Sequence, residues 1–228
     1  MTSLSYVFLP VATVVVGAIL TLWRRPSEAL TSAMQHVAAG AVFAAAATEV
    51  LPQVMHAAAP NATFIGGALG IAAMLLLKAL EGHVNGAGVL LGVIGIDILI
   101  AGLVLGLAFI AGERTGLLLA IGITLEVLFL GVTLARELHK STASKITVIT
   151  MVLVLTLLLP LGALLVTPLA SFSPLVISGF LSFGLMALLY LVTEELLAEA
   201  RWTRESPVMS AMFFAGFLSL VLIEEAMA

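Results

Sequence analysis

The chain has 228 residues, of which 62% are hydrophobic and only 10% are charged, and its formal net charge is -4. A soluble domain carries about a quarter charged residues and less than half apolar ones. The composition therefore excludes an ordinary soluble protein and indicates an all-α integral membrane protein. The absence of cysteine excludes disulfides, thiolate metal sites and a cysteine nucleophile. No basic cluster is long enough to indicate nucleic-acid binding.

Eight apolar segments are long enough to cross a bilayer as helices, which takes about 20 residues each. They are separated by short stretches rich in charged residues, proline, glycine, asparagine or serine. Because backbone groups in lipid must be paired within the segment or in a closed barrel, apolar runs of this length favour helices. The sequence predicts a single transmembrane domain over residues 1–228. Its predicted spans cover residues 5–23, 30–54, 63–81, 86–111, 115–138, 146–168, 173–197 and 207–227.

The basic residues predict how these spans are oriented. The first apolar segment, from Val7 to Trp23, has no basic residue before it and no small-residue cleavage site before a soluble domain. It is interpreted as a retained helix and not as a signal peptide. Of the nine basic residues, only Arg114 lies in a connection that follows an even-numbered span. Since lysine and arginine mark cytoplasmic connections, both termini are predicted to lie outside the cytoplasm.

Two segments of the chain suggest an internal repeat. The second span ends in TEVLPQV and the seventh in TEELLAEA, and a glycine-containing span follows each of them. Spans two and seven run in opposite directions. The similarity therefore suggests that spans 1–3 and 6–8 are an inverted repeat around spans 4 and 5, a 3+2+3 bundle of the kind that many transporters use. Chance similarity between helices rich in small residues is the alternative.

Asp97 and Glu126 lie near the middle of the fourth and fifth spans. Each lies about eleven residues into its span, and at about 1.5 Å per residue both reach roughly the bilayer midplane, from opposite sides. The short turn AGERTG between the spans makes them neighbours. An acid at the centre of a span costs about 2.5–3.5 kcal/mol, and two ionised carboxylates repel each other unless a cation lies between them. The pair is predicted to form a cation site, with a protonated, hydrogen-bonded pair as the structural alternative.

Three further acids are candidates for a cation pathway through the bundle. Glu49 lies about five residues from the end of the second apolar run, too deep to be simply solvated. Glu194 and Glu195 lie toward the cytoplasmic end of the seventh span, where an interfacial position near Arg201 and Arg204 is the alternative. No H-x-x-x-H or H-E-x-x-H pattern is present, which excludes a histidine-rich zinc protease site.

These features resemble the zinc/iron permease (ZIP) family of divalent-metal transporters. DILIAG in the fourth span resembles the family's acid-Gly-x-Ala-x-Gly stretch, with Asp97 at the acid and Gly102 at the last glycine. EVLFLG resembles the matching stretch of the fifth span, with Glu126 and Gly131 in those places. GAVFAAAATEVLPQ and EELLAEA resemble the ends of the second and seventh spans. The resemblance implies eight spans and a mid-membrane metal site, often binuclear, to which Asp97 and Glu126 contribute.

The sequence departs from the family pattern around the predicted metal site. Val93 and Ile94 stand where the family usually has His and Asn, and Gly122 and Ile123 stand at the comparable positions of the fifth span. The proline before each acid and the histidine-rich loop between spans three and four are also missing. The remaining candidate ligands are all oxygen atoms. Nitrogen ligands favour zinc whereas oxygen ligands suit harder ions such as Mn²⁺, so the resemblance and the ligand set indicate different metals.

The sequence thus predicts a transporter, not an enzyme, that moves Zn²⁺, Fe²⁺ or Mn²⁺ as its substrate by alternating access. No organic cofactor is expected, and the predicted location is the cell (inner) membrane. The expected partners are lipid and the cation, and the G-x-x-x-G faces of the fourth span also allow a homodimer. One alternative is a ZIP-like protein that has lost transport and acts as a sensor or scaffold. The other is an intramembrane protease, because TEELLAEAR is similar to a Glu-Glu-x-x-x-Arg motif, although Glu199 stands at its arginine position.

Overall fold

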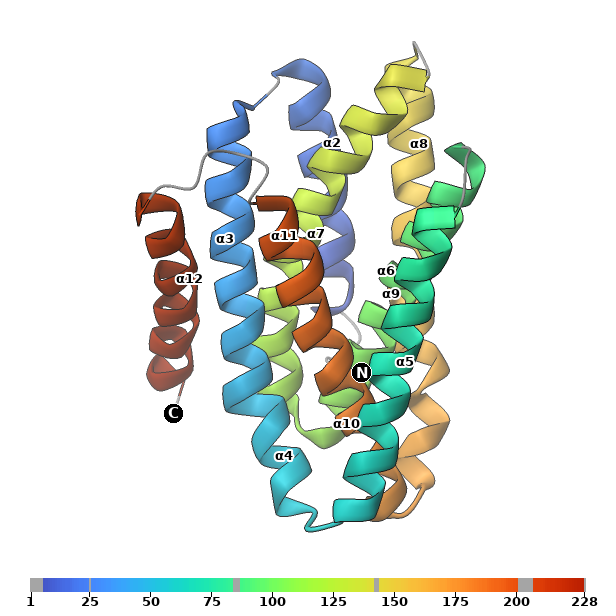
Figure 1. Cartoon of the computed structure of the whole chain (residues 1–228), viewed down its shortest axis with the longest axis vertical. Helices are drawn as coiled ribbons and strands as arrows, with labels where there is room; N and C mark the ends of the chain where they lie inside the picture. Colours follow the sequence, from blue (N-terminus) through green and yellow to red (C-terminus); the bar gives the residue numbers. More distant parts are fainter. Residues whose placement is uncertain (1–5, 25, 84–86, 142–143, 201–206, 228) are drawn as a thin grey trace.

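The computed structural model describes residues 6–24, 26–83, 87–141, 144–200 and 207–227. Within these ranges the regular structure is entirely helical and contains no strand (Figure 1). The all-α prediction is confirmed for these ranges. Seven of the described helices are long and apolar enough to cross a membrane, which agrees with the prediction of a membrane protein. The shorter apolar helix α2 (Phe8–Trp23) precedes them. Its 16 residues extend for about 24 Å, so the first predicted span, and with it the count of eight, stays a prediction.

The second span is a continuous helical segment with three consecutive parts. They are α3 (Glu28–Ala45), the π-helical segment η1 (Ala46–Val50) and α4 (Leu51–His56). The side chain of Ser27 caps its start by accepting a hydrogen bond from the Leu30 N–H. In η1 the Leu51 N–H bonds to the carbonyl of Ala46, five residues back. Pro52 has no N–H to give to the regular helical pattern, which accounts for the irregular turn at this point.

The next three spans follow the predicted ranges within a few residues. They are α5 (Pro60–His83), α6 (Ala87–Ala111) and α7 (Glu113–Ser141). Only Gly112 separates α6 from α7, so the two helices reverse direction in a tight turn and pack against each other. This places the spans that carry Asp97 and Glu126 side by side.

The sixth span, predicted over residues 146–168, corresponds to one apolar helical stretch, Lys145–Ser171, whose hydrogen-bonding pattern changes along the chain. It consists of α8 (Lys145–Thr156), α9 (Leu158–Leu165) and the 3-10 turn η2 (Thr167–Ser171). Pro160 cannot donate a hydrogen bond to the carbonyl of Thr156, four residues back, which explains why α8 ends there.

The seventh span again contains a π-helical turn. It is built from α10 (Pro174–Tyr190), η3 (Leu191–Leu196) and α11 (Leu197–Ala200), and α12 (Pro207–Ala226) follows it. In η3 the Leu197 N–H bonds to the carbonyl of Val192, five residues back. No proline accompanies this second π-helical turn, and nothing else in the sequence explains it.

The helices pack as four close pairs around the central contact between α6 and α7. These pairs are α2 with α7, α6 with α9, α5 with α10, and α3 with α12 (Figure 1). Each pair has a glycine from each helix at the contact, and at all of them except Gly179 an added methyl group would press on the partner helix. The glycines are Gly17 and Gly131, Gly102 and Gly162, Gly66 and Gly179, and Gly40 and Gly216. Small residues of this kind let helices in membranes approach closely.

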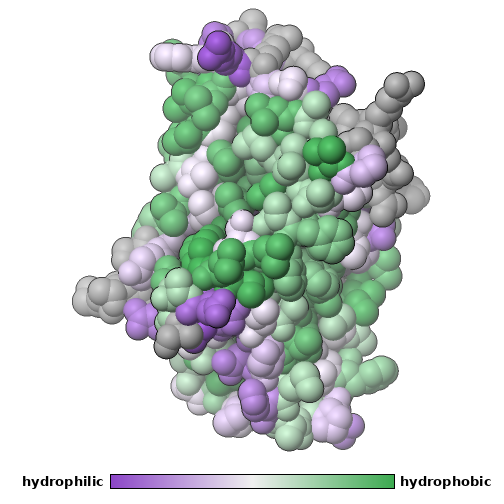
Figure 2. Space-filling view, turned by 90° about the vertical axis from the view of Figure 1, so that its left-hand side faces the viewer, coloured by the Kyte–Doolittle hydropathy of each residue, from purple (hydrophilic) through white to green (hydrophobic). Residues whose placement is uncertain are grey.

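The outer surface of the bundle is apolar over its middle. Figure 2 shows hydrophobic residues across the centre of one face and hydrophilic ones toward its two ends. Large side chains such as Phe64 and Phe214 are strongly exposed. The described part of α12 buries only Gly216 and Leu220. An apolar surface of this extent is unfavourable in water and is what a lipid-facing bundle requires.

Two substitutions on α6 test whether glycine contacts hold the bundle together. The Gly102→Ala variant would push a methyl group into the backbone of α9 at Leu159, and we expect it to lower stability by about 1–3 kcal/mol. The Gly92→Ala variant is the control, because nothing lies within 4 Å of the added carbon. Alanine should stabilise the helix there by about 0.5–1 kcal/mol. Thermal unfolding in detergent measures both, and equal effects would contradict the packing role.

Candidate functional site

Asp97 of α6 and Glu126 of α7 line the same small cavity inside the bundle, which has a volume of about 50 Å³. Glu126 is buried, with 5% of its surface exposed, and Asp97 is partly buried. The structure thus brings together the two acids that their equal depth in neighbouring spans singled out. A cavity of this volume has room for at least one water molecule.

The buried amide of Gln35 lines the same cavity, although the sequence did not single this residue out. The only sequence signal was an amide within a span rich in alanine and valine. Thr133 of α7 also lines the cavity, as do Leu191 and Leu196 at the two ends of η3. The polar lining therefore comes from three helices, α3, α6 and α7, and all its polar side chains can present oxygen atoms.

One oxygen atom of each carboxyl group is buried away from solvent. Oδ1 of Asp97 and Oε2 of Glu126 are buried and accept no hydrogen bond from the residues that the structure describes. Both side chains also take part in other polar or electrostatic contacts. Across the described ranges, no three His, Asp or Glu side chains lie close enough to hold a metal ion together. The cavity therefore offers two carboxyl groups, one amide and one hydroxyl.

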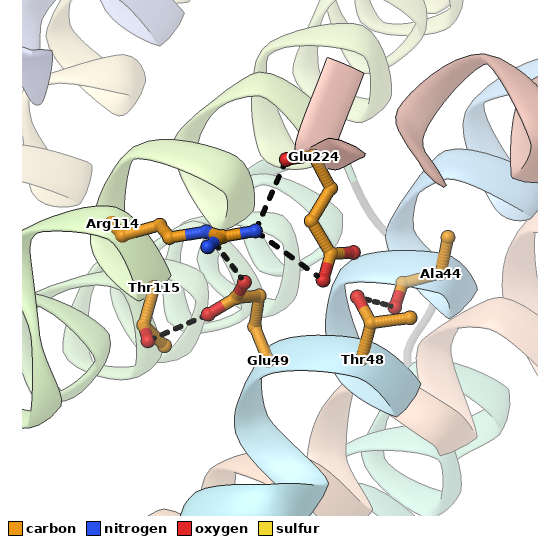
Figure 3. A network of polar contacts seen from close by, with 6 residues as sticks. All are labelled: Ala44, Thr48, Glu49, Arg114, Thr115 and Glu224. Atoms are coloured by element: carbon orange, nitrogen blue, oxygen red, sulfur yellow. Dashed lines mark hydrogen bonds and ion pairs between the residues drawn. The ribbon is translucent and has the colours of Figure 1, made fainter. Parts of the chain in front are cut away.

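Glu49 lies in a separate polar network, at the end of the bundle where α7 begins (Figure 3). Its Oε1 is 3.6 Å from Nε of Arg114, and its Oε2 accepts a 2.7 Å hydrogen bond from the Thr115 hydroxyl. Nη2 of Arg114 also donates a 3.0 Å hydrogen bond to the carbonyl of Glu224 and lies 3.8 Å from Oε1 of that residue. We refer to Glu49, Arg114, Thr115 and Glu224 as the Arg114 network.

The Arg114 network joins three helices that are far apart in the sequence. Glu49 comes from η1 in the second span, Arg114 and Thr115 from the first turn of α7, and Glu224 from the last turn of α12. The carbonyl that accepts from Arg114 belongs to the end of a helix, where carbonyls lack partners within the helix. Arg114 was the one basic residue outside the predicted cytoplasmic connections, and here two carboxylates compensate its charge.

Of the other two predicted pathway residues, Glu194 lies apart from the cavity lining. Glu194 lies within η3 and is exposed, while Leu191 and Leu196 of the same segment face the cavity. The side chain of Glu195 lies outside the described part of the chain. Thr193, the residue before Glu194, donates a 2.9 Å hydrogen bond to the carbonyl of Leu189. Thr48 before Glu49 does the same to Ala44 (Figure 3).

Fully buried apolar side chains separate the cavity from the Arg114 network. Glu126 lies twelve positions after Arg114 on α7, a rise of about 18 Å. Within this interval Leu119 and Ile123 have no exposed surface, and the same holds for Val42 and Ala45 on the facing helix α3. The two polar centres are therefore isolated from each other by an apolar layer, which we call the apolar plug.

A second, larger cavity of about 240 Å³ lies between α5 and α10. Its lining is apolar and includes Ile65, Leu69, Phe180 and Phe183. A surface without polar side chains provides no ligand for a cation, so this cavity is not a candidate for the predicted site.

No protein-family model matches this sequence, and a comparison with curated proteins finds no significant match.

A threonine pair on α7 tests the importance of the Arg114 network for stability. Thr115 is 3% exposed and donates to a buried carboxylate. We expect Thr115→Val to lower the free energy of unfolding by about 1.5–3 kcal/mol, the range for hydrogen bonds to charged groups. Thr124→Val is the matched control, because Thr124 donates only to the carbonyl of Ala120 in its own helix. Similar unfolding temperatures for the two variants would show that the contact to Glu49 contributes little.

Proposed function

We propose that the chain is a ZIP-like transporter that moves a divalent metal cation across the membrane by alternating access. Asp97 and Glu126 are its central cation ligands, and Gln35 and Thr133 complete the polar lining of the site. The observation that carries this proposal is the shared cavity of the two acids at the centre of an apolar bundle. Ionisable residues within a membrane are costly and usually mark ion pathways.

The pattern of helix contacts supports an eight-span, 3+2+3 inverted repeat for this transporter. Exchanging spans 1, 2 and 3 with spans 6, 7 and 8, and span 4 with span 5, turns each close pair into another close pair. The pair α2 with α7 becomes α9 with α6, and α3 with α12 becomes α10 with α5. A chain with two similar halves is expected to repeat its contacts in this way.

Equivalent positions in the two proposed halves support the same assignment. Asp97 precedes Gly102 by five residues, and Glu126 precedes Gly131 by five. Both glycines approach the backbone of the partner helix. The Thr-Glu pairs that suggested the repeat, Thr48-Glu49 and Thr193-Glu194, both lie in π-helical turns. Such turns are rare in proteins, and those that do occur frequently lie at functional sites.

The charge distribution supports an orientation for the bundle. Arg136, near the end of α7 opposite to Arg114, donates a 2.6 Å hydrogen bond to the carbonyl of Pro26. Most basic residues belong to the connections after the odd-numbered spans, which are at this same end of the bundle. By the preference of basic residues for the cytoplasmic side, this end faces the cytoplasm, and the Arg114 network and both termini face outside. The membrane in question is the cell (inner) membrane.

The ligand set supports a hard cation as the preferred substrate. Carboxylate, amide and hydroxyl oxygens suit Mn²⁺ or Mg²⁺ better than zinc, and two carboxylates line the cavity among the residues that the structure describes. A bound ion would complete its coordination with water or backbone carbonyls, as hard cations commonly do. Among Zn²⁺, Fe²⁺ and Mn²⁺, the structure's side chains therefore favour Mn²⁺.

Uptake of Mn²⁺ and Zn²⁺ into proteoliposomes tests the proposed function. Asp97→Ala and Glu126→Gln should each reduce uptake by at least about ten-fold, which corresponds to losing about 1.4 kcal/mol or more of cation binding. Glu113→Gln is the control, because this carboxylate is exposed at the start of the same helix as Glu126. Undiminished uptake by the Asp97 variant would overturn the site assignment.

A membrane protein of this fold without transport activity is the second candidate. It is favoured by the lack of a three-residue His, Asp or Glu group in the described part of the chain. Thermal unfolding with and without Mn²⁺ distinguishes the two. A cation at about 100 times its Kd adds about 2.7 kcal/mol to the stability of a protein that binds it. A stability shift that disappears in Asp97→Ala supports the transporter, and no shift with any metal supports the inactive protein.

A further inference from the structure

The two ends of the bundle differ in how they give access to the Asp97–Glu126 cavity. On α7 the cavity is lined by Phe129, Leu130 and Thr133, all of which lie beyond Glu126 toward the end at Ser141. On α3 it is lined by Gln35, which lies nearer to the start of that helix than the plug residues Val42 and Ala45 do. The cavity therefore extends away from the Arg114 network, toward the opposite end of the bundle.

The end near Arg114 is closed by two successive barriers. The first is the apolar plug, formed where α3 and α7 pack together without any exposed surface at Val42, Ala45 and Ile123. α7 and α3 are also in contact at Gly122, where an added methyl group would lie at an ordinary van der Waals distance of 3.4 Å from the Cα atom of Val42. The second is the Arg114 network, which connects the end of α12 and the second span to the first turn of α7 (Figure 3).

We propose that the Arg114 network is a latch that closes this end of the bundle and must break before the cavity can be reached from that side. The inference rests on the proposed function, because it assigns the closed gate of an alternating-access cycle. It also gives Glu49 a different role from the one the sequence suggested. Glu49 holds the gate closed through Arg114 and is not a ligand along an open cation path.

The contacts of the network suit a closure that can be reversed. Both ion pairs are long, at 3.6 and 3.8 Å, and the Arg114 side chain is 44% exposed, so water can replace its partners. Glu49, by contrast, is buried, so it stabilises the closed state only while Arg114 and Thr115 stay in contact with it. Without Arg114, the two carboxylates of Glu49 and Glu224 would face each other and repel.

The helices connected by the latch are also able to separate. α12 packs mainly on α3 and has few contacts with α7, so the hydrogen bond from Arg114 to Glu224 is a main connection between α12 and α7 in this structure. Breaking the network removes the polar connection between α7 and the second and eighth spans, which pack together as a pair, and leaves the apolar contact between α3 and α7 to hold that pair in place. A movement of the pair away from α7 would open this contact, which forms the plug.

Cysteine labelling tests the latch directly, since the natural sequence contains no cysteine. The reporter is Ile123→Cys, at a position in the plug with no exposed surface. Its reaction rate with a positively charged methanethiosulfonate is measured on the full chain, purified in detergent and without metal. Rates are compared in the otherwise natural background, in Arg114→Gln and in Glu224→Gln. Glu225→Gln is the matched control, because Glu225 neighbours Glu224 on α12 and is exposed.

We expect labelling of the reporter to become at least about ten-fold faster with Arg114→Gln, which corresponds to a shift of about 1.4 kcal/mol toward the open state. Glu224→Gln should have a smaller effect in the same direction, and Glu225→Gln should have none. A second reporter, Leu159→Cys, is buried between α9 and α6 and should stay slow in every background. Fast labelling at both reporters would mean that the variant unfolds and that the network is only a structural support, which would overturn the latch.

Unchanged labelling of Ile123→Cys in the Arg114 and Glu224 variants would also overturn the latch. The assay needs neither metal nor transport, so its result is independent of the uptake experiment. Faster labelling together with absent cation uptake would support the latch as a closure of the cavity and reject the transporter. Normal uptake together with unchanged labelling would support the transporter and reject the latch.

Discussion

A charge buried among apolar helices must be compensated within the protein, because lipid provides neither water nor counter-ions. The bundle meets this constraint in two ways. Glu49 is compensated by a guanidinium and a hydroxyl on α7, whereas Asp97 and Glu126 share one cavity with a buried amide. The first arrangement neutralises its carboxylate and joins helices. The second places two carboxyl groups at a cavity with room for a small ligand. Under the proposed function, the first arrangement closes one end of the bundle and the second binds the cation.

The close approach of helix backbones makes both arrangements possible. In every close pair, a glycine on each helix lies against the other helix, so the pairs pack without long side chains between them. This leaves the centre of the bundle to α6 and α7, the two helices that carry the paired acids. The apolar plug does not depend on glycine in the same way, because a methyl group added at Gly122 would make only ordinary contacts with α3. Glycines therefore position the candidate site, whereas larger apolar side chains separate it from the Arg114 network.

Much of the fold could be predicted from composition alone, because apolar segments of about 20 residues have few other solutions in lipid. The proximity of Asp97 and Glu126 also followed, from equal depth and a short connection. The partner of Glu49 did not, because Arg114 lies 65 residues away in the sequence and its position depends on how the second and fifth spans pack. Gln35 was missed for a similar reason, since a single amide in a span does not indicate which neighbours it faces. The end of α8 before Pro160 could have been predicted, since proline interrupts a helix, but residues 146–168 were treated as a single span.

The π-helical turns in the second and seventh spans change how the faces of these spans are assigned. A π-helical turn takes up one residue more than an α-helical turn, so a helical wheel drawn through it loses its phase by about 100°. Positions before Ala46 and after Val50 therefore belong to two different wheels, and the same is true on either side of residues Leu191–Leu196. A scan of either span for lipid-facing and core-facing positions has to be phased separately in each part. A single periodicity extended from Gln35 would predict the wrong face for Val54.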